Sequence, residues 1–210
     1  MNHLINNPKQ FWDERHRTDN EWLSGGDKAI STHRNKAFYA HRLGLLVGIL
    51  DSYFNRDYLR ILDAGCGKGW LSDQLASHGH MVSGIDSSET AIQICKQHRN
   101  GDYSVSSLSQ FSSRELYDTV LCMDVLFHIL DQIEWLNSLR NLASLVTVDG
   151  ILIIADDPRD KKYTMGDYIV HRSMEEYIGN LIKLGFTLIE SVPYRFGGNP
   201  NKFLLFKRTK

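Results

Sequence analysis

Short apolar runs alternate with helix-like stretches along most of this chain, and this alternation restricts its fold more than any other feature. We expect buried strands at residues 59–65, 80–86, 102–108, 117–124 and 149–157. We expect helices at residues 35–54, 69–79, 87–98, 130–145 and 172–186, where apolar residues recur with helical spacing. Strands that alternate with helices form a mostly parallel sheet with helices on both faces. The sequence therefore predicts a doubly wound α/β fold.

Local signals predict several helix ends. Gly79 is expected at the C′ position that ends the helix at residues 69–79. Either Ser87 or Ser88 can cap the next helix through its side-chain oxygen. Ser173 and Glu176 have the spacing of a capping box at the start of the last helix.

The two ends of the chain differ from the alternating part. Residues 186–196 and 201–208 are joined by Gly-Gly-Asn-Pro-Asn, which predicts an antiparallel hairpin and hence a mixed sheet. There is no internal repeat and no linker, and a length of 210 residues suits one domain. We expect a single domain over residues 1–210, with an N-terminal helical lid or cap at 1–57 and the core at 58–210.

Composition disfavours several classes of partner. The formal net charge is −1, with 42% hydrophobic and 23% charged residues, so no overall field favours nucleic acid or an acidic membrane surface. No apolar run reaches membrane-spanning length, and the N-terminus lacks the basic-then-apolar plan of a signal peptide. Cys66, Cys95 and Cys122 fit no metal or redox spacing and suit buried thiols in a reducing compartment. We therefore expect a cytoplasmic protein.

Three glycines at every second position, Gly65, Gly67 and Gly69, follow the first expected strand directly. Glycine permits positive φ and lets a ligand approach the backbone, and ligands of α/β sheets bind beyond the carboxyl ends of the strands. Asp86 ends the second strand about twenty residues later, where a carboxylate can accept both ribose hydroxyls. The G-x-G-x-G spacing matches neither the dinucleotide nor the phosphate-loop pattern, which favours a cofactor with ribose but no pyrophosphate. A glycine-rich turn without a ligand is the alternative.

Three segments together resemble a known family. "ILDAGCGKGWLSDQL" (residues 61–75), "VSGIDSSETAI" (82–92) and "YDTVLCMDVLFHI" (117–129) are similar in order and spacing to the class I S-adenosylmethionine-dependent methyltransferases. The resemblance covers roughly Leu59 to Asp157. It implies a Rossmann-like sheet of seven strands with the last one antiparallel, which agrees with the expected C-terminal hairpin. It also implies S-adenosylmethionine as cofactor and S-adenosylhomocysteine as product.

The resemblance implies roles for individual residues around this cofactor. Asp63 and the loop of Gly65, Cys66, Gly67 and Gly69 would hold its methionine part. Asp86 would bind the ribose with Ser87 beside it, Ser107 and Leu108 would edge the adenine, and Met123 would cover the cofactor. Many family members carry Asp where Ser107 stands, although a hydroxyl can still bond the adenine amino group.

The N-terminal segment "FWDERHR" is interpreted as a lid over the cofactor, because Trp12 and the later Trp22 offer large apolar area. A lid excludes water from the reaction. The alternative is that both tryptophans pack this segment onto the sheet.

His128 follows the fourth expected strand, on the rim where a substrate should bind. An imidazole with an ordinary pKa near 6.5 suits a general base. Related methyltransferases often carry a histidine here, which implies a residue that lines the pocket. The alternative is a structural histidine that caps the following helix.

Asp124 ends the fourth expected strand, and Asp156 and Asp157 end the fifth, which is its neighbour in the sheet order that the resemblance implies. Three carboxylates at one rim could bind Mg²⁺. The arrangement is similar to that of metal-dependent O-methyltransferases that act on catechols and some sugars. In the alternative, Asp124 lies near the cofactor while Asp156 and Asp157 are capping residues, solvated in a loop before Pro158. We list Asp124, Asp156 and His128 as catalytic candidates and leave a metal site open.

His171 and Arg172 precede the last long helix and can reach an anionic or hydroxylated substrate, or form a pair that faces solvent. The favoured function is methylation of a small molecule, chiefly O-methylation of a hydroxylated metabolite, sugar or natural product. "MDVLFH" stands where amino-methylating enzymes of DNA and protein carry an Asn/Asp-Pro-Pro-Tyr motif, and no basic patch is present. The alternatives are a methyltransferase of RNA or protein and a silent cofactor-binding module, while the loop spacing disfavours an NAD-dependent enzyme.

Overall fold

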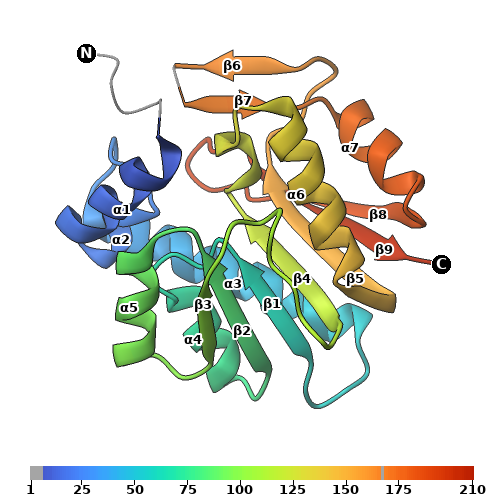
Figure 1. Cartoon of the computed structure of the whole chain (residues 1–210), viewed down its shortest axis with the longest axis horizontal. Helices are drawn as coiled ribbons and strands as arrows, with labels where there is room; N and C mark the ends of the chain where they lie inside the picture. Colours follow the sequence, from blue (N-terminus) through green and yellow to red (C-terminus); the bar gives the residue numbers. More distant parts are fainter. Residues whose placement is uncertain (1–6, 167) are drawn as a thin grey trace.

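A seven-stranded sheet lies between two layers of helices in the computed structural model, which describes residues 7–166 and 168–210 (Figure 1). Its strands are, in spatial order, β3 (Asp102–Val105), β2 (Met81–Asp86), β1 (Arg60–Ala64), β4 (Tyr117–Met123), β5 (Val146–Asp156), β9 (Lys202–Arg208) and β8 (Phe186–Pro193). The first five strands are parallel, and β9 runs antiparallel to both of its neighbours. The structure confirms the doubly wound sheet and its C-terminal hairpin.

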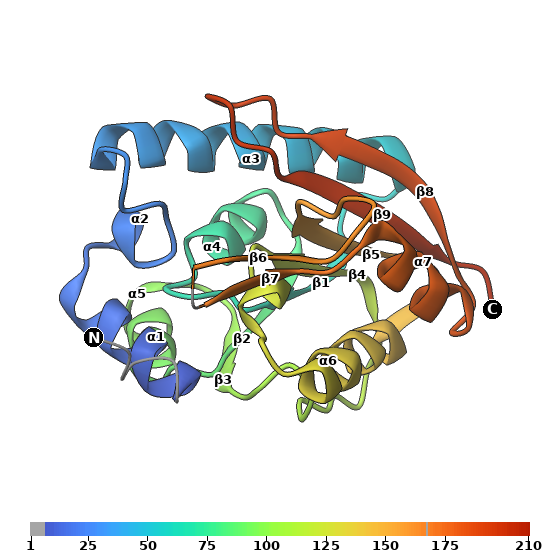
Figure 2. The same cartoon turned by 90° about the horizontal axis from the view of Figure 1, so that it is seen from above.

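Helices cover both faces of this sheet because its strands bury side chains on both faces. The helices are α3 (Thr32–Tyr53), α4 (Trp70–Ser77), α5 (Glu89–His98), α6 (Gln132–Ser144) and α7 (Met174–Ile182). Successive residues of β1 take opposite faces: Ile61 packs in the core with α3 and α4, and Leu62 in the core with α6 and α7. Figure 2 shows α3 and α4 on one side of the strands and α6 on the other.

The helix ends follow the local signals. Ser88, and not Ser87, caps α5 by accepting a hydrogen bond of 3.1 Å from the backbone N–H of Ala91. Gly79 follows α4 with a φ of +92°, as expected for a C′ glycine. Ser173 and Glu176 form a complete capping box at the start of α7.

Short elements complete the framework: α1 (Pro8–Thr18), α2 (Glu21–Ser24), the 3₁₀ helix η1 (Leu126–His128), β6 (Tyr163–Met165) and β7 (Ile169–His171). The antiparallel pair β6–β7 has no counterpart in the expected elements, because strands of three residues are too short for a visible periodicity. Helix α1 packs against α5, at the edge of the sheet where β3 and β2 lie. Within residues 7–166 and 168–210, no helix has both the length and the apolar character needed to cross a membrane.

Candidate functional site

The turn from β1 into α4 has a conformation that requires glycine. Gly65, Gly67 and Gly69 all have positive φ, at +87°, +53° and +76°, a region that other residues adopt only at a cost. A Cβ atom at Gly65 would also overlap the side chain of Val125. The backbone N–H of Gly65 donates to Ile85 O at 2.7 Å, which ties the turn to the end of β2.

Asp86 lies beside this turn, where the sequence predicts it. Its Oδ2 accepts a hydrogen bond of 2.9 Å from Gly67 N, and its Oδ1 accepts one of 2.8 Å from Ser88 N. Each carboxylate oxygen keeps a further lone pair for a ligand. Ser87 lies half-buried between Asp86 and Ser88. The structure thus brings the glycine turn and the acidic strand end together.

Two other predicted residues of this turn have different surroundings. Asp63 is 2% exposed and accepts a hydrogen bond of 2.6 Å from Ser72 Oγ. Burial raises the pKa of Asp63 from 3.8 to about 6, although the Ser72 hydrogen bond opposes this effect. The Cys66 side chain packs with Cys95 and Tyr103, on the side of α5 and β3. The Cys66 thiol is thus partly buried against α5 and β3.

Helix α1 lies across the glycine turn. A Cβ atom at Gly67 would be 3.3 Å from Cε1 of His16, so this ring covers the turn directly. His16 is 4% exposed, and burial lowers its pKa. Its Nδ1 is buried without a hydrogen-bond partner in the described chain. Lys68 Nζ donates to Asp19 O at 2.7 Å, just beyond the end of α1.

Asp13 anchors the same helix to the start of α5. Its carboxylate accepts hydrogen bonds from Ser88 Oγ at 2.8 Å, Thr90 N at 2.9 Å and Thr90 Oγ1 at 3.0 Å. The Thr90 N–H is the main reason that the pKa of Asp13 falls to about 2. Sequence reasoning missed Asp13 and His16, because no spacing rule connects residue 13 with residue 90. Their only signal is their place in the segment interpreted as a lid.

The rings of Trp12 on α1 and His128 on η1, directly after β4, contact each other edge-on with centroids 4.8 Å apart. His128 Nδ1 donates to Tyr168 O at 3.1 Å, and the two rings stack at 5.6 Å. Burial lowers the pKa of His128 from 6.5 to about 4, so the imidazole is neutral at neutral pH. Asp131 caps α6, so the alternative in which His128 caps that helix is wrong. Trp22 lies apart from Trp12 and packs against α3 and α4.

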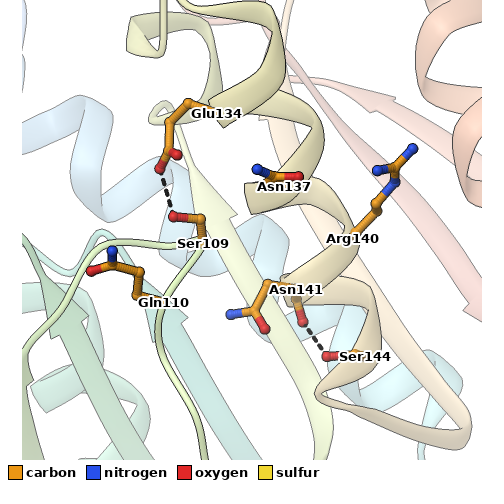
Figure 3. Close-up of a pocket in the computed structure, with 7 residues that line it drawn as sticks. All are labelled: Ser109, Gln110, Glu134, Asn137, Arg140, Asn141 and Ser144. Atoms are coloured by element: carbon orange, nitrogen blue, oxygen red, sulfur yellow. Dashed lines mark hydrogen bonds between the residues drawn. The ribbon is translucent and has the colours of Figure 1, made fainter.

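The predicted adenine edge follows β3. Ser107 Oγ lies 3.3 Å from Ser109 Oγ. Ser109 Oγ in turn donates to Glu134 Oε1 at 2.6 Å (Figure 3). The Glu134 carboxylate is thus linked through Ser109 to Ser107, the position at which the resemblance implies Asp in many family members. The Leu108 side chain is 7% exposed and belongs to the core, so only its backbone can contact a ligand. Met123 ends β4 and packs against the core on the side of α3 and α4.

A shallow depression with a volume of about 520 Å³ lies beside this edge, over α6 (Figure 3). Its lining is polar and consists of Ser109, Gln110, Glu134, Asn137, Arg140, Asn141 and Ser144. Arg140 is the single basic side chain of the lining, and no apolar side chain contributes to it. Ligand pockets are mostly apolar with a few convergent polar groups. The depression therefore has little of the chemistry of a ligand site.

The three carboxylates proposed for Mg²⁺ have separate protein partners. Asp124 pairs with Arg42, Asp156 with His171, and Asp157 with Arg159. In the described part of the chain, no group of three or more His, Cys, Asp or Glu residues could hold a metal ion. The structure therefore contradicts the magnesium hypothesis for these residues. The solvated alternative is also wrong, because Asp156 is 0% and Asp157 3% exposed.

Asp124 lies directly after β4 in a left-handed conformation, with a φ of +59°. This conformation is uncommon outside glycine, although Asp and Asn adopt it more readily than most residues. Arg42 of α3 forms an ion pair with one carboxylate oxygen, and Asn201 Nδ2 donates to the other at 2.7 Å. Burial raises the pKa of Asp124, although Arg42 opposes this effect. Asp124 thus connects α3 with the β8–β9 loop at the ends of the parallel strands.

Arg172 faces neither a substrate nor solvent, contrary to both sequence-based alternatives. It is 0% exposed. Its guanidinium donates to Ile129 O at 2.7 Å, Val170 O at 3.0 Å and Leu130 O at 3.1 Å. Arg172 therefore fixes the loop after η1 against β7. His171, its neighbour, turns to Asp156 instead.

The family described as "Methyltransferase domain" matches residues 61–150. This span contains β1, the glycine turn, Asp86 and β4, which are the parts that build the candidate site. Over this span the chain is similar to the methyltransferase domain family. This similarity agrees with the sheet order and with the antiparallel β9.

Curated relatives that this chain is similar to include two proteins named ubiquinone biosynthesis O-methyltransferase. The one from Rickettsia canadensis is 31% identical over 165 residues, which are 76% of this chain and 65% of that protein. The one from Coxiella burnetii is 31% identical over 131 residues, which are 60% of this chain and 53% of that protein. The chain thus spans less than two thirds of the length of these relatives.

Solved structures share the methyltransferase fold over almost the whole chain. Magnesium protoporphyrin IX methyltransferase from Synechocystis PCC 6803, with bound SAM, is 23% identical with a TM-score of 0.75, covering 96% of this chain and 97% of that one. The N-methyltransferase NodS from Bradyrhizobium japonicum WM9, in complex with S-adenosyl-L-homocysteine, is 20% identical with a TM-score of 0.72. That match covers 97% of this chain and 100% of NodS.

Proposed function

We propose that this chain transfers a methyl group from S-adenosylmethionine to a hydroxyl group of a small molecule and releases S-adenosylhomocysteine. The observation that carries the proposal is the hydrogen bond from Gly67 N to Asp86, which joins the glycine turn to an acidic strand end. The glycines of the turn let a ligand approach the backbone closely, and the Asp86 carboxylate beside them can accept hydrogen bonds from ribose hydroxyls. This combination suits a ligand that has a ribose and no pyrophosphate.

Groups around the turn fit this cofactor. Asp86 keeps lone pairs for ribose hydroxyls, and the buried Asp63 supplies negative charge near the methionine part. His16 Nδ1 is a buried polar atom without a partner in residues 7–166 and 168–210, and a bound ligand can satisfy such an atom. The proposed contact residues are Trp12, Asp63, Gly65, Cys66, Gly67, Gly69, Asp86, Ser87, Ser107, Leu108 and Met123.

When bound, S-adenosylmethionine supplies an electrophilic methyl group on a sulfonium centre. The chain itself must hold the acceptor in line with that methyl group and keep water out. Alignment of two reactants can account for about 7–11 kcal/mol of a barrier. We assign water exclusion to the N-terminal cap, in which Asp13 holds α1 on α5 and His16 covers the turn.

The acceptor site is proposed at the carboxyl ends of β4 and β5, where Asp124, His128 and Asp156 lie. The names of the ubiquinone biosynthesis O-methyltransferases favour a hydroxyl acceptor. The net charge of −1 gives no support to a nucleic-acid acceptor. Methylation of RNA or protein, and cofactor binding without catalysis, are the competing outcomes of the test.

The first experiment is calorimetric titration of the whole chain with S-adenosylhomocysteine and, separately, with NAD. We expect micromolar binding of the former only, lost in Asp86→Ala and kept in Asp102→Ala. Asp102 is a matched control because it is an exposed carboxylate on the neighbouring strand. Thermal unfolding of each variant shows whether a loss of binding reflects a loss of fold.

The second experiment follows tritium from methyl-labelled S-adenosylmethionine into small-molecule, RNA and protein fractions of a cell extract. Label in phenols, catechols or alcohols of the small-molecule fraction supports the proposal. Label in RNA or protein alone would replace the proposed acceptor class. Binding without any transfer would leave the chain as a cofactor-binding module, and absence of binding would overturn the proposal.

A further inference from the structure

A buried carboxylate and a histidine form a pair at the end of β5. Asp156 is 0% exposed, and its Oδ1 accepts hydrogen bonds from His171 Nδ1 and, at 2.7 Å, from Asp157 N. Its Oδ2 accepts a hydrogen bond of 2.6 Å from Tyr177 OH. Buried carboxylates are stabilised when their oxygens are occupied by donors in this way. Because Asp156 accepts, the proton of the neutral imidazole lies on Nδ1 and the lone pair on Nε2.

The ring of His171 has a fixed orientation. It stacks on Tyr163 with centroids 4.7 Å apart and packs against Phe127 on η1 at 4.9 Å. His171 is 5% exposed. Its Nε2 has no hydrogen-bond partner among the described residues. This nitrogen is also not among the fully buried polar atoms without a partner, so it is not completely enclosed by protein atoms. Among residues 7–166 and 168–210 no donor occupies the lone pair of Nε2, which can therefore accept a proton from a bound molecule.

The pair lies at the end of β5, one strand beyond the strands that carry the proposed cofactor residues. In the sheet order, β2, β1 and β4 carry the residues proposed for the cofactor, and β5 is the next strand. Phe127, which contacts His171, belongs to the segment directly after β4. Ligands of such sheets bind beyond the carboxyl ends of the strands. A substrate that extends past the cofactor from β4 toward β5 thus approaches His171.

We infer that His171 is the general base for the acceptor hydroxyl and that Asp156 is its positioning residue. This inference rests on the proposed function. The hydroxyl oxygen forms a bond to the methyl carbon, the C–S bond breaks with its electron pair left on sulfur, and the hydroxyl proton passes to Nε2. Positive charge thereby moves from the sulfonium to the imidazolium, beside the Asp156 carboxylate that stabilises it.

His128 at the same rim lacks these features. Its Nδ1 donates to the carbonyl of Tyr168 and not to a carboxylate. Burial lowers its pKa to about 4, which disfavours the protonated state that a base must reach. His128 is therefore assigned to the wall of the acceptor site, beside Trp12.

One test needs no acceptor. Proton-detected nitrogen NMR of ¹⁵N-histidine-labelled protein reports which nitrogen of His171 carries the proton, with assignment by His171→Gln. We expect the Nδ1–H form with a free Nε2 in the wild type, and a change of this signature in Asp156→Asn. An Nε2–H form, or an Nε2 already engaged in a hydrogen bond, would overturn the inference.

The kinetic test uses the acceptor fraction labelled in the tritium experiment. His171→Ala is expected to lower kcat about 100-fold or more, the usual contribution of a general base, with unchanged S-adenosylhomocysteine affinity. Added imidazoles should restore the rate in proportion to their basicity, which a purely structural filler would not do. His98→Ala is the control, because His98 is exposed on α5.

The possible failures are distinguishable. If the wild type does not bind S-adenosylhomocysteine, the proposed function itself fails. If the wild type methylates and His171→Ala keeps its kcat, or if rescue is independent of imidazole basicity, only the assignment of the base is wrong.

Discussion

Asp63 offers a quantitative test of the electrostatics at the glycine turn. Its carboxyl group is 2% exposed, and burial raises its pKa from 3.8 to about 6. One pKa unit corresponds to about 1.4 kcal/mol, so ionisation of Asp63 costs the folded state about 3 kcal/mol. The change to make is Asp63→Asn, which keeps an oxygen for Ser72 Oγ and removes the charge.

The sign follows from proton linkage. A carboxyl group whose folded pKa is raised contributes stability that is present below pH 3.8 and lost as the pH rises through 6. The Asp63→Asn variant has no carboxyl group at this position, so it does not lose this stability as the pH rises. Its free energy of unfolding, minus that of the wild type, should therefore increase by about 2–3 kcal/mol between pH 4 and pH 8. Any change in the free energy of unfolding that the amide causes equally at all pH values cancels between the measurements at pH 4 and pH 8.

Urea unfolding followed by tryptophan fluorescence at several pH values measures this difference. Asp102→Asn, at an exposed carboxylate, should run parallel to the wild type. Excess S-adenosylhomocysteine should stabilise the wild type by about 2.7 kcal/mol at 100 times its Kd and stabilise Asp63→Asn less. Parallel pH curves for Asp63→Asn and the wild type would refute the burial argument.

Three further changes test other parts of the site. Gly65→Ala places a Cβ against Val125 at positive φ and should cost about 2 kcal/mol or more, seen as a lower Tm; an unchanged Tm would contradict the close packing. Asp13→Ala should release α1, raise hydrogen exchange at residues 8–18 and weaken S-adenosylhomocysteine binding; native exchange would show that other contacts hold the helix. Glu134→Gln removes the charge that orients Ser109 and should weaken S-adenosylhomocysteine several-fold, with little effect on its inosine analogue; equal losses for both would argue against adenine recognition through this serine.

The sequence by itself determined the sheet and the glycine turn. Apolar runs mark strands that are buried on both faces, and this property is local to each run. The Ser173–Glu176 capping box, and a cap at Ser87 or Ser88, were readable for the same reason, because a cap acts within three residues of its helix. Asp86 was found because parallel strands end at one edge of a sheet, so position along the chain predicts position in space.

Only the tertiary structure decided the partners of the buried charged groups. Asp13 and Thr90 are 77 residues apart, and no periodicity connects them. Asp156 was predicted to be catalytic or metal-binding, and its pairing with His171 appears only once the β6–β7 hairpin folds over β5. Hydrophobic pattern and caps depend on near neighbours, whereas a buried charge takes whichever donor a distant segment brings to it. For this reason the position of the site follows from the sequence and its chemistry from the fold.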